Sequence, residues 1–214
     1  MGVVTGRNEE RAKEVVDKIK ADGGEAIYVI ADTSDLDSSQ KIFDATMQAY
    51  GTVDILFNNA GVLSTTPLTE LTLDEWQKVM NVNVTSPMLL TKLCADELTK
   101  NHGHIVNTAS VAGCAAKWGP VAYCTSKHAM MGLTKAMANE LRGIHVNGIC
   151  PGAIKTAMLD GSGADDVIEF MRTAAPVGRI GAPEEIATPV LFLCTDESSF
   201  IDGQLIRVDG GVDC

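Results

Sequence analysis

The sequence lacks long hydrophobic runs, a cysteine pair at redox or metal spacing, and any block of basic charge. Its six cysteines are scattered, and none forms a Cys-x-x-Cys motif, which argues against a thioredoxin-like centre or a zinc ribbon. Scattered cysteines within apolar stretches are typical of reduced thiols in a cytoplasmic protein. We therefore expect a cytoplasmic protein without a metal site.

Further absences narrow the classes of partner that the protein could bind. The apolar runs fall short of the roughly 20 residues that a membrane span needs, and the N-terminus has no basic segment followed by an apolar stretch, so no secretory signal is predicted. The net charge of -11 leaves no basic face for phosphates. It argues against a nucleic-acid binder and against an anionic membrane surface. A small-molecule partner is the remaining expectation.

What the sequence does contain is a regular alternation of short apolar runs with longer amphipathic stretches. The 214 residues are 45% hydrophobic, show no repeat or linker, and predict a single domain over residues 1–214. Strands are expected at residues 3–5, 26–31, 53–57, 104–107, 144–150 and 205–208. Helices are expected at residues 9–21, 38–50, 73–100, 121–141 and 183–194, the third interrupted near Ser86-Pro87. This order predicts an α/β fold with a doubly wound parallel sheet covered by helices on both faces.

Tyr123 and Lys127 are the first candidate catalytic residues. Their spacing places both side chains on one helix face. An ammonium beside a phenol favours the phenolate and lowers the tyrosine pKa, which makes the pair suitable for acid–base catalysis. Ser110 lies just beyond a predicted strand, where its hydroxyl and the phenol could both form hydrogen bonds with one substrate oxygen. Each residue alone also has an ordinary interpretation, a solvated helix face for the pair and a capping or turn serine for Ser110.

A set of motifs in fixed order and spacing resembles the short-chain dehydrogenase/reductase family. The motifs are Asn58-Asn59-Ala60-Gly61, Asn83 in Asn-Val-Asn-Val, Ser110, Tyr123-x-x-x-Lys127, and Pro151-Gly152-x-Ile154-x-Thr156. The segments Gly178-Arg179-Ile180-Gly181-x-Pro183 and Val208-Asp209-Gly210-Gly211 are also similar to the family pattern. The resemblance covers residues 3–211.

The resemblance implies an NAD(P)-dependent oxidoreductase that interconverts a secondary alcohol and a ketone by hydride transfer. By this resemblance Tyr123 transfers the proton and Ser110 polarises the carbonyl. Lys127 binds the nicotinamide ribose and lowers the tyrosine pKa, and Asn83 supports a water-mediated proton relay. The cofactor carries the hydride chemistry.

The resemblance also implies a set of cofactor-binding residues at the carboxyl ends of the strands, where ligands of such sheets bind. Besides Tyr123 and Lys127, they are Asp32 beside the adenine, Asn59, Ala60 and Gly61 along the cleft, and Pro151, Gly152, Ile154 and Thr156 on the nicotinamide side. Arg7 is a further candidate, because a basic residue there suits the 2′-phosphate of NADP, which is favoured over NAD. An exposed arginine at the opening of a helix is the other interpretation.

The start of the chain departs from the family pattern. The family opens with a strand, a Thr-Gly-x-x-x-Gly-x-Gly turn and a helix whose N-terminus holds the pyrophosphate. Here Thr5-Gly6 is followed by Arg7-Asn8-Glu9-Glu10, without further glycines. Residues 3–6 are either a remnant of the second strand, with about 30 residues of one strand–helix unit absent, or the first strand joined to a later helix.

This departure predicts a sheet of about six strands with exposed inner edges and weakened cofactor binding. The alternative function is a non-catalytic truncated remnant that at most associates with intact subunits.

Assembly and substrate contacts complete the expectations. The family pairs the helices that match residues 85–100 and 121–141, which here carry Met88, Leu89, Leu90, Met130, Met131 and Leu133. A homodimer or homotetramer is therefore expected. Trp118 lies between Ser110 and Tyr123, where the family's substrate loop runs, and is expected either to line a pocket or to pack.

Overall fold

The computed structural model describes residues 1–160 and 165–213 as an α/β, Rossmann-like fold. Strand β1 (Gly2–Gly6) pairs with β2 (Ala26–Ile30). Strands β3 (Ile55–Asn58), β4 (His104–Thr108), β5 (His145–Pro151) and β6 (Leu205–Val208) follow one another in a second sheet. All of these pairings are parallel, which confirms the predicted fold class.

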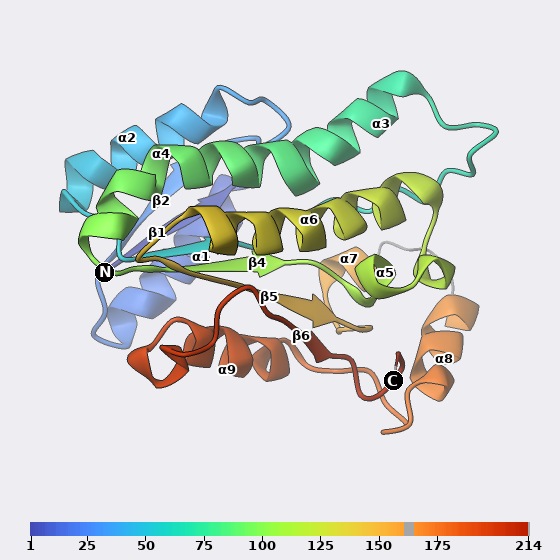
Figure 1. Ribbon diagram of the computed structural model, residues 1–214. Helices are drawn as coiled ribbons and strands as arrows, with labels where there is room; N and C mark the ends of the chain where they lie inside the picture. Colours follow the sequence, from blue (N-terminus) through green and yellow to red (C-terminus); the bar gives the residue numbers. More distant parts are fainter. Residues whose placement is uncertain (161–164, 214) are drawn as a thin grey trace.

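Helices cover both faces of the strands (Figure 1). One layer holds α2 (Ser38–Tyr50), α4 (Ser86–Lys100) and α6 (Val121–Glu140), and the other holds α1 (Glu9–Ala21) and α9 (Pro183–Leu193). Short helices gather at the carboxyl ends of the strands: α5 (Val111–Cys114), α7 (Ala157–Asp160) and α8 (Asp165–Ala174). The helix α3 (Leu73–Met80) leads into α4.

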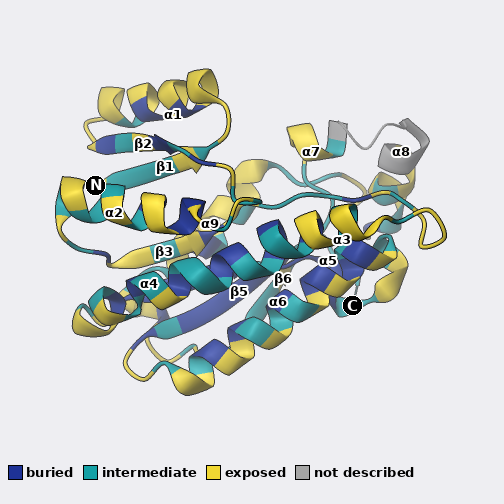
Figure 2. Cartoon of the chain, turned by 90° about the horizontal axis from the view of Figure 1, so that it is seen from above, coloured by how far each residue is buried: buried dark blue, intermediate teal, exposed yellow. Residues whose placement is uncertain are grey.

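The six predicted strands are all present, and their hydrogen bonding is divided between a two-stranded and a four-stranded sheet, which leaves the exposed inner edges that the sequence predicts. Within the described residues, the free edges of β1 and β3 bond to no strand. The division falls where the family pattern places its first strand. On β3 it leaves Ile55 49% and Phe57 40% exposed. Figure 2 shows β1 and β2, with α1 beside them, as a group at one side of the molecule.

Local sequence signals explain where the elements begin and end. Asn8 caps α1, and its side chain accepts a hydrogen bond from the Arg11 N–H at 2.9 Å. Gly51 ends α2 in the left-handed region, with φ 70°. The expected interruption before Ser86-Pro87 is a π-helical turn, Asn81–Thr85. Such turns are frequent at functional sites, and this one carries Asn83.

The core lies around β4 and β5, whose residues are almost all buried (Figure 2). Leu98, Ile105 and Val146 pack between these strands and the α4–α6 layer. Met130 is also buried, only 1% exposed, against Ala109 and Cys150. Of the two roles that the sequence allows for Met130, core packing or a subunit interface, the structure favours core packing, because the residue faces inward from α6.

Among the described residues, no helix is both long enough and apolar enough to cross a membrane.

Candidate active site

Ser110, Tyr123 and Lys127 meet beyond the carboxyl end of β4. Ser110 is the N-cap of α5, and its hydroxyl accepts a hydrogen bond from the Ala112 N–H at 3.1 Å. The same hydroxyl interacts with the Tyr123 phenol and favours its ionised form. Lys127 follows one turn later on α6, with its Nζ 5.7 Å from the centre of the Tyr123 ring. Ser110 is thus both a capping serine and a neighbour of the phenol.

Lys127 is a buried lysine without a carboxylate partner among the described residues. Its side chain is held by one hydrogen bond, from Nζ to the Thr108 carbonyl oxygen at 2.9 Å. Burial disfavours the ammonium form and lowers the pKa of Lys127 to about 8. The group therefore titrates close to neutral pH.

The pKa of Tyr123 differs from the expectation. Burial raises the pKa of this phenol, and the hydrogen bond with Ser110 opposes part of the rise. Burial is the dominant influence on this phenol, and Lys127 Nζ, which lies 5.7 Å from the ring centre, donates to the Thr108 carbonyl rather than to the phenol. The phenol is consequently protonated at neutral pH, ready to act as an acid.

Asn83 lies at the base of this group and is 1% exposed. Its amide nitrogen donates to the Val62 carbonyl at 2.9 Å and to the Ser126 hydroxyl at 3.0 Å. Its carbonyl oxygen accepts from the Val62 N–H at 2.8 Å. Ser126 in turn donates to the Tyr123 carbonyl at 2.7 Å. Asn83 thus connects the loop after β3 to the helix turn that carries Tyr123.

Gly61 lies between the catalytic candidates and the cofactor cleft. A Cβ atom at this glycine would lie 3.5 Å from Asn83 Oδ1 and 3.7 Å from Lys127 Nζ. Asn59 is linked to the same region, because its Oδ1 accepts from the Thr108 hydroxyl at 3.3 Å. Gly61 therefore adjoins Asn83 and Lys127, and it also lines the cavity described next.

A cavity of about 230 Å³ lies at the carboxyl ends of β1, β2 and β3. Arg7 Nη1 and Asp32 Oδ2 are 3.8 Å apart at its edge. The Ser34 N–H and hydroxyl donate to Asp32 Oδ1 at 2.9 and 2.8 Å, and these bonds, followed by the charge of Arg7, lower the pKa of Asp32. The cavity brings together five of the predicted residues or their neighbours: Gly6, Arg7, Asp32, Ala60 and Gly61.

The predicted nicotinamide-side residues lie at the end of β5, and among the described residues they do not line this cavity. The Gly152 N–H donates to the Val208 carbonyl at 3.1 Å. A Cβ atom at Gly152 would lie 2.9 Å from the Cα of Asp209, so the close approach of the two segments requires glycine. Ile154 forms a parallel bridge with Gly181, and the Thr156 hydroxyl donates to the Ile154 carbonyl at 3.4 Å. Pro151 is the last residue of β5.

Two features of the site were not predicted from the sequence. Lys78 lines the same cavity as Arg7 and adds a second cation there, although nothing in its local helical pattern marks it. Asn58 and Asn107 form a buried polar pair on neighbouring strands, with a 2.8 Å hydrogen bond between their amides. A polar residue inside an otherwise apolar strand is the signal for the second feature, because buried amides need partners.

A larger cavity, about 330 Å³, lies at the opposite ends of the strands and is bordered by Asp54, His102, His104, Cys194 and Asp196. In the part of the chain that the structure describes, no three His, Cys, Asp or Glu side chains are grouped to hold a metal ion. This cavity is remote from Ser110 and Tyr123, which lie toward the carboxyl ends of the strands.

Known proteins match almost the whole chain. Residues 2–213 match the family model described as enoyl-(acyl carrier protein) reductase. The meso-2,3-butanediol dehydrogenase of Serratia marcescens is 38% identical over 204 residues, which cover 94% of this chain and 81% of that protein. A 3-oxoacyl-[acyl-carrier-protein] reductase of Synechocystis sp. is 38% identical over 205 residues, with the same two coverages.

Solved structures agree with these relatives. A dehydrogenase/reductase from Sinorhizobium meliloti 1021 superposes with a TM-score of 0.93 and 33% identity, covering 99% of this chain and 84% of that one. The gluconate 5-dehydrogenase from Burkholderia cenocepacia J2315 in complex with NADP and tartrate superposes with a TM-score of 0.89 and 28% identity, covering 98% and 84%. The chain therefore belongs to the short-chain dehydrogenase/reductase family of oxidoreductases.

Proposed function

We propose that the chain interconverts a secondary alcohol and a ketone with a nicotinamide cofactor. The observation that carries the proposal is the convergence of Ser110, Tyr123 and Lys127 beyond β4, next to Gly61, which lines the cavity. A buried phenol, a hydroxyl and a buried amine in one group are typical of a site that performs acid–base chemistry at a substrate oxygen.

The proposed mechanism follows from these side chains. The bound nicotinamide supplies or accepts the hydride. In reduction, the hydroxyls of Ser110 and Tyr123 both donate hydrogen bonds to the carbonyl oxygen, which polarises the carbon. Tyr123 then gives its proton to the developing alkoxide. The Lys127 ammonium, present below a pH of about 8, stabilises the phenolate that remains.

The cavity fits the adenosine end of such a cofactor. Asp32 offers a carboxylate for the adenine, and the small residues Ala60 and Gly61 leave room along the cleft. Arg7 and Lys78 supply two cations at the same cavity, which supports NADP over NAD because the 2′-phosphate needs a positive partner. Asn59 and the segment of Pro151, Gly152, Ile154 and Thr156 are proposed to border the nicotinamide side.

The direct test is titration of the purified chain with NADPH and NADH, followed by turnover of a panel of ketones. We expect saturable binding of at least one nucleotide and ketone-dependent loss of the reduced nicotinamide absorbance. Absence of both binding and turnover would favour the alternative function, a non-catalytic chain that associates with intact subunits. Two observations on the described residues support this alternative: the edges of β1 and β3 that bond to no strand, and the exposed side chains of Ile55 and Phe57.

The choice between the two nucleotides gives a first prediction. Arg7→Ala is expected to weaken NADPH binding about tenfold, the effect of losing one charge-assisted hydrogen bond, and to leave NADH binding nearly unchanged. Isothermal titration calorimetry with each nucleotide measures the difference. Arg11→Ala, an exposed arginine on α1, is the matched control. An equal loss for both nucleotides would show that Arg7 does not contact the 2′-phosphate.

A second prediction concerns assembly. We propose a homodimer or homotetramer formed through α4 and α6, where Met88, Leu89 and Leu90 are partly exposed and Val121 is 42% exposed. Light scattering of the purified chain at micromolar concentration is expected to give two or four times the mass of one chain. A monomer mass would contradict the proposal.

A further inference from the structure

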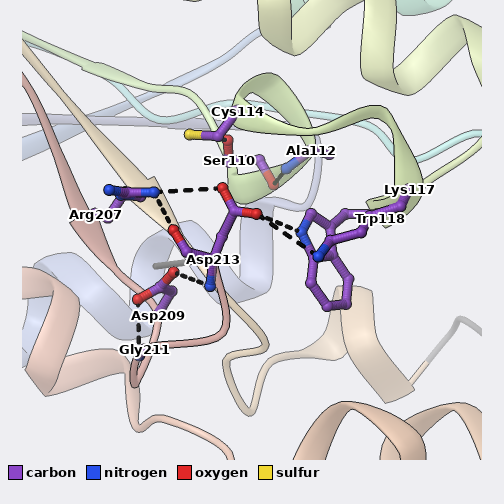
Figure 3. Close-up of polar contacts among 9 residues, drawn as sticks. All are labelled: Ser110, Ala112, Cys114, Lys117, Trp118, Arg207, Asp209, Gly211 and Asp213. Carbon is purple, nitrogen blue, oxygen red and sulfur yellow. Dashed lines mark hydrogen bonds and ion pairs between the residues drawn. The ribbon is translucent and has the colours of Figure 1, made fainter. Parts of the chain in front are cut away.

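The five residues after β6 form a compact turn, residues 209–213, which we call the C-terminal turn. The Asp209 carboxylate accepts hydrogen bonds from the Gly211 N–H at 2.9 Å and from the Asp213 N–H at 3.1 Å. Gly210 and Gly211 occupy the left-handed region, with φ of 65° and 84°, which only glycine adopts without strain. The turn thereby directs the Asp213 side chain back toward the active-site loops (Figure 3).

Asp213 joins this turn to the loop between Ser110 and Tyr123. Its Oδ1 accepts a hydrogen bond from the Trp118 indole N–H at 3.2 Å and lies 4.0 Å from Lys117 Nζ. Its Oδ2 is 3.4 Å from Arg207 Nη1, and the same guanidinium donates to the Asp213 carbonyl. The carboxylate is only 14% exposed, so its contacts are weakly screened by solvent. Figure 3 shows the carboxylate held between Arg207 and the indole.

The C-terminal turn also touches the other segments around the site. Asp209 packs against Gly152 of the nicotinamide-side segment, where a Cβ would come within 2.9 Å of the Asp209 Cα. The Gly210 carbonyl accepts from the Val177 N–H at 3.3 Å, in the chain that follows α8. One turn therefore fixes Trp118, the end of α8 and the segment after β5 relative to one another.

Trp118 lies beside α8 and precedes Tyr123 in the chain. The next residue, Gly119, lies so close to Tyr123 that a Cβ there would be 3.2 Å from Tyr123 Cδ1. The Trp118 ring faces the Phe170 ring of α8, with centroids 6.4 Å apart and planes inclined by 42°. Phe170 is 61% exposed, and Trp118 is half-buried. Two aromatic rings thus form an open apolar wall between α8 and the loop that leads into the helix of Tyr123.

We infer that Trp118 and Phe170 select substrates whose carbonyl or alcohol carbon bears a hydrocarbon or aromatic ring, and that Asp213 is the positioning residue that holds Trp118 in this wall. The inference rests on the proposed function, because the wall borders the substrate only if Tyr123 is the proton donor. A tilted pair of rings with one exposed member offers stacking and edge contacts to a third ring.

The specificity test compares benzylacetone with butanone, which differ by one phenyl group. In Trp118→Ala the ratio of kcat/KM for benzylacetone to that for butanone is expected to fall about tenfold or more, whereas Trp118→Phe keeps most of it. Asp213→Ala is expected to lower the same ratio, mainly through KM. In the Trp118→Phe background, Asp213→Ala is expected to change little, since no indole N–H remains to be positioned. An unchanged ratio in Trp118→Ala would overturn the inference that Trp118 selects the substrate.

A second readout is independent of turnover. The sequence has two tryptophans, so Trp76→Phe leaves Trp118 as the only indole fluorophore. In this background Asp213→Ala is expected to shift the Trp118 emission to longer wavelength and to increase quenching by acrylamide. Asp213→Asn keeps an acceptor oxygen, so its emission wavelength is expected to lie between those of the Trp76→Phe background and Asp213→Ala. Asp17→Ala, on the exposed face of α1, is the charge-matched control. Unchanged emission in Asp213→Ala would overturn the positioning role.

The two failures are distinguishable. If the wild-type chain binds neither nucleotide and turns over no ketone of the panel, the proposed function fails. In that case the emission of Trp118 still decides whether Asp213 positions it. Quenching of the Trp118 emission by benzylacetone and by butanone at equal concentration then tests whether Trp118 contacts the aromatic ring of the ketone. Preferential quenching by benzylacetone supports this contact, and equal quenching contradicts it.

Discussion

Replacing Tyr123 with phenylalanine is expected to lower kcat at least about a hundredfold, the usual contribution of general acid–base catalysis, while the chain stays folded. The substitution removes the proton and keeps the ring, so the packing against Gly119 is retained. Turnover of the best ketone with its preferred nucleotide gives kcat, and thermal unfolding followed by circular dichroism gives stability. KM is expected to change less than kcat, because the ring and the cofactor contacts are preserved.

Tyr28→Phe is the matched control for this variant. Tyr28 lies on β2 and donates its hydroxyl to Glu9 at 3.1 Å, far along the chain from Ser110. Removal of that phenol is expected to leave kcat unchanged. Near-normal turnover of a folded Tyr123→Phe variant would contradict the proposed mechanism.

The strands, the main helices and the catalytic helix could be predicted because their signals are local. Asn8 and Gly51 mark helix ends by their capping chemistry, and apolar runs bounded by such residues define the buried strands. The i,i+4 spacing of Tyr123 and Lys127 fixes their shared helix face without any tertiary information. The sequence motifs then placed Ser110 beside the phenol, a placement that depends only on the strand end and the helix start.

What could not be predicted depends on residues far apart in the chain. Asp213 and Trp118 are separated by 95 positions, and only the fold brings their side chains together. Lys78 enters the cofactor cavity because α3 passes over it, not because of its neighbours in the sequence. The pKa of Tyr123 depends on how deeply the site is buried, which a spacing rule does not contain.

Replacing Lys127 with methionine is expected to produce two large and opposite effects, a loss of activity and a gain in stability. Activity is expected to fall at least about tenfold and cofactor affinity to weaken, because the amine stabilises the phenolate and is proposed to hold the ribose. The apparent basic pKa of the pH–rate profile is expected to rise, since the phenolate loses its cationic neighbour. Lys92→Met, an exposed lysine of α4, is the control for both measurements.

The stability effect follows from the buried charge. Burial lowers the pKa of Lys127 from 10.5 to about 8, so between these pH values the unfolded chain binds a proton that the folded chain does not. The wild-type free energy of unfolding should therefore gain a contribution as pH rises through this window, of up to roughly 3 kcal/mol. Below a pH of about 8 both states are protonated and the burial cost is fully present.

Urea unfolding across this pH window measures the difference between the wild type and Lys127→Met, in which the titration of all other groups cancels. The variant is expected to be more stable than the wild type at neutral pH, because it has no burial cost for the amine. This gain in the free energy of unfolding is reduced by the roughly 1–3 kcal/mol that is lost when the Thr108 carbonyl loses its donor. Its advantage is expected to shrink as pH rises toward 10.5. If the two curves of unfolding free energy against pH run parallel, Lys127 is not a buried titrating amine. An active site that weakens its own fold through a desolvated lysine is the arrangement that the geometry predicts.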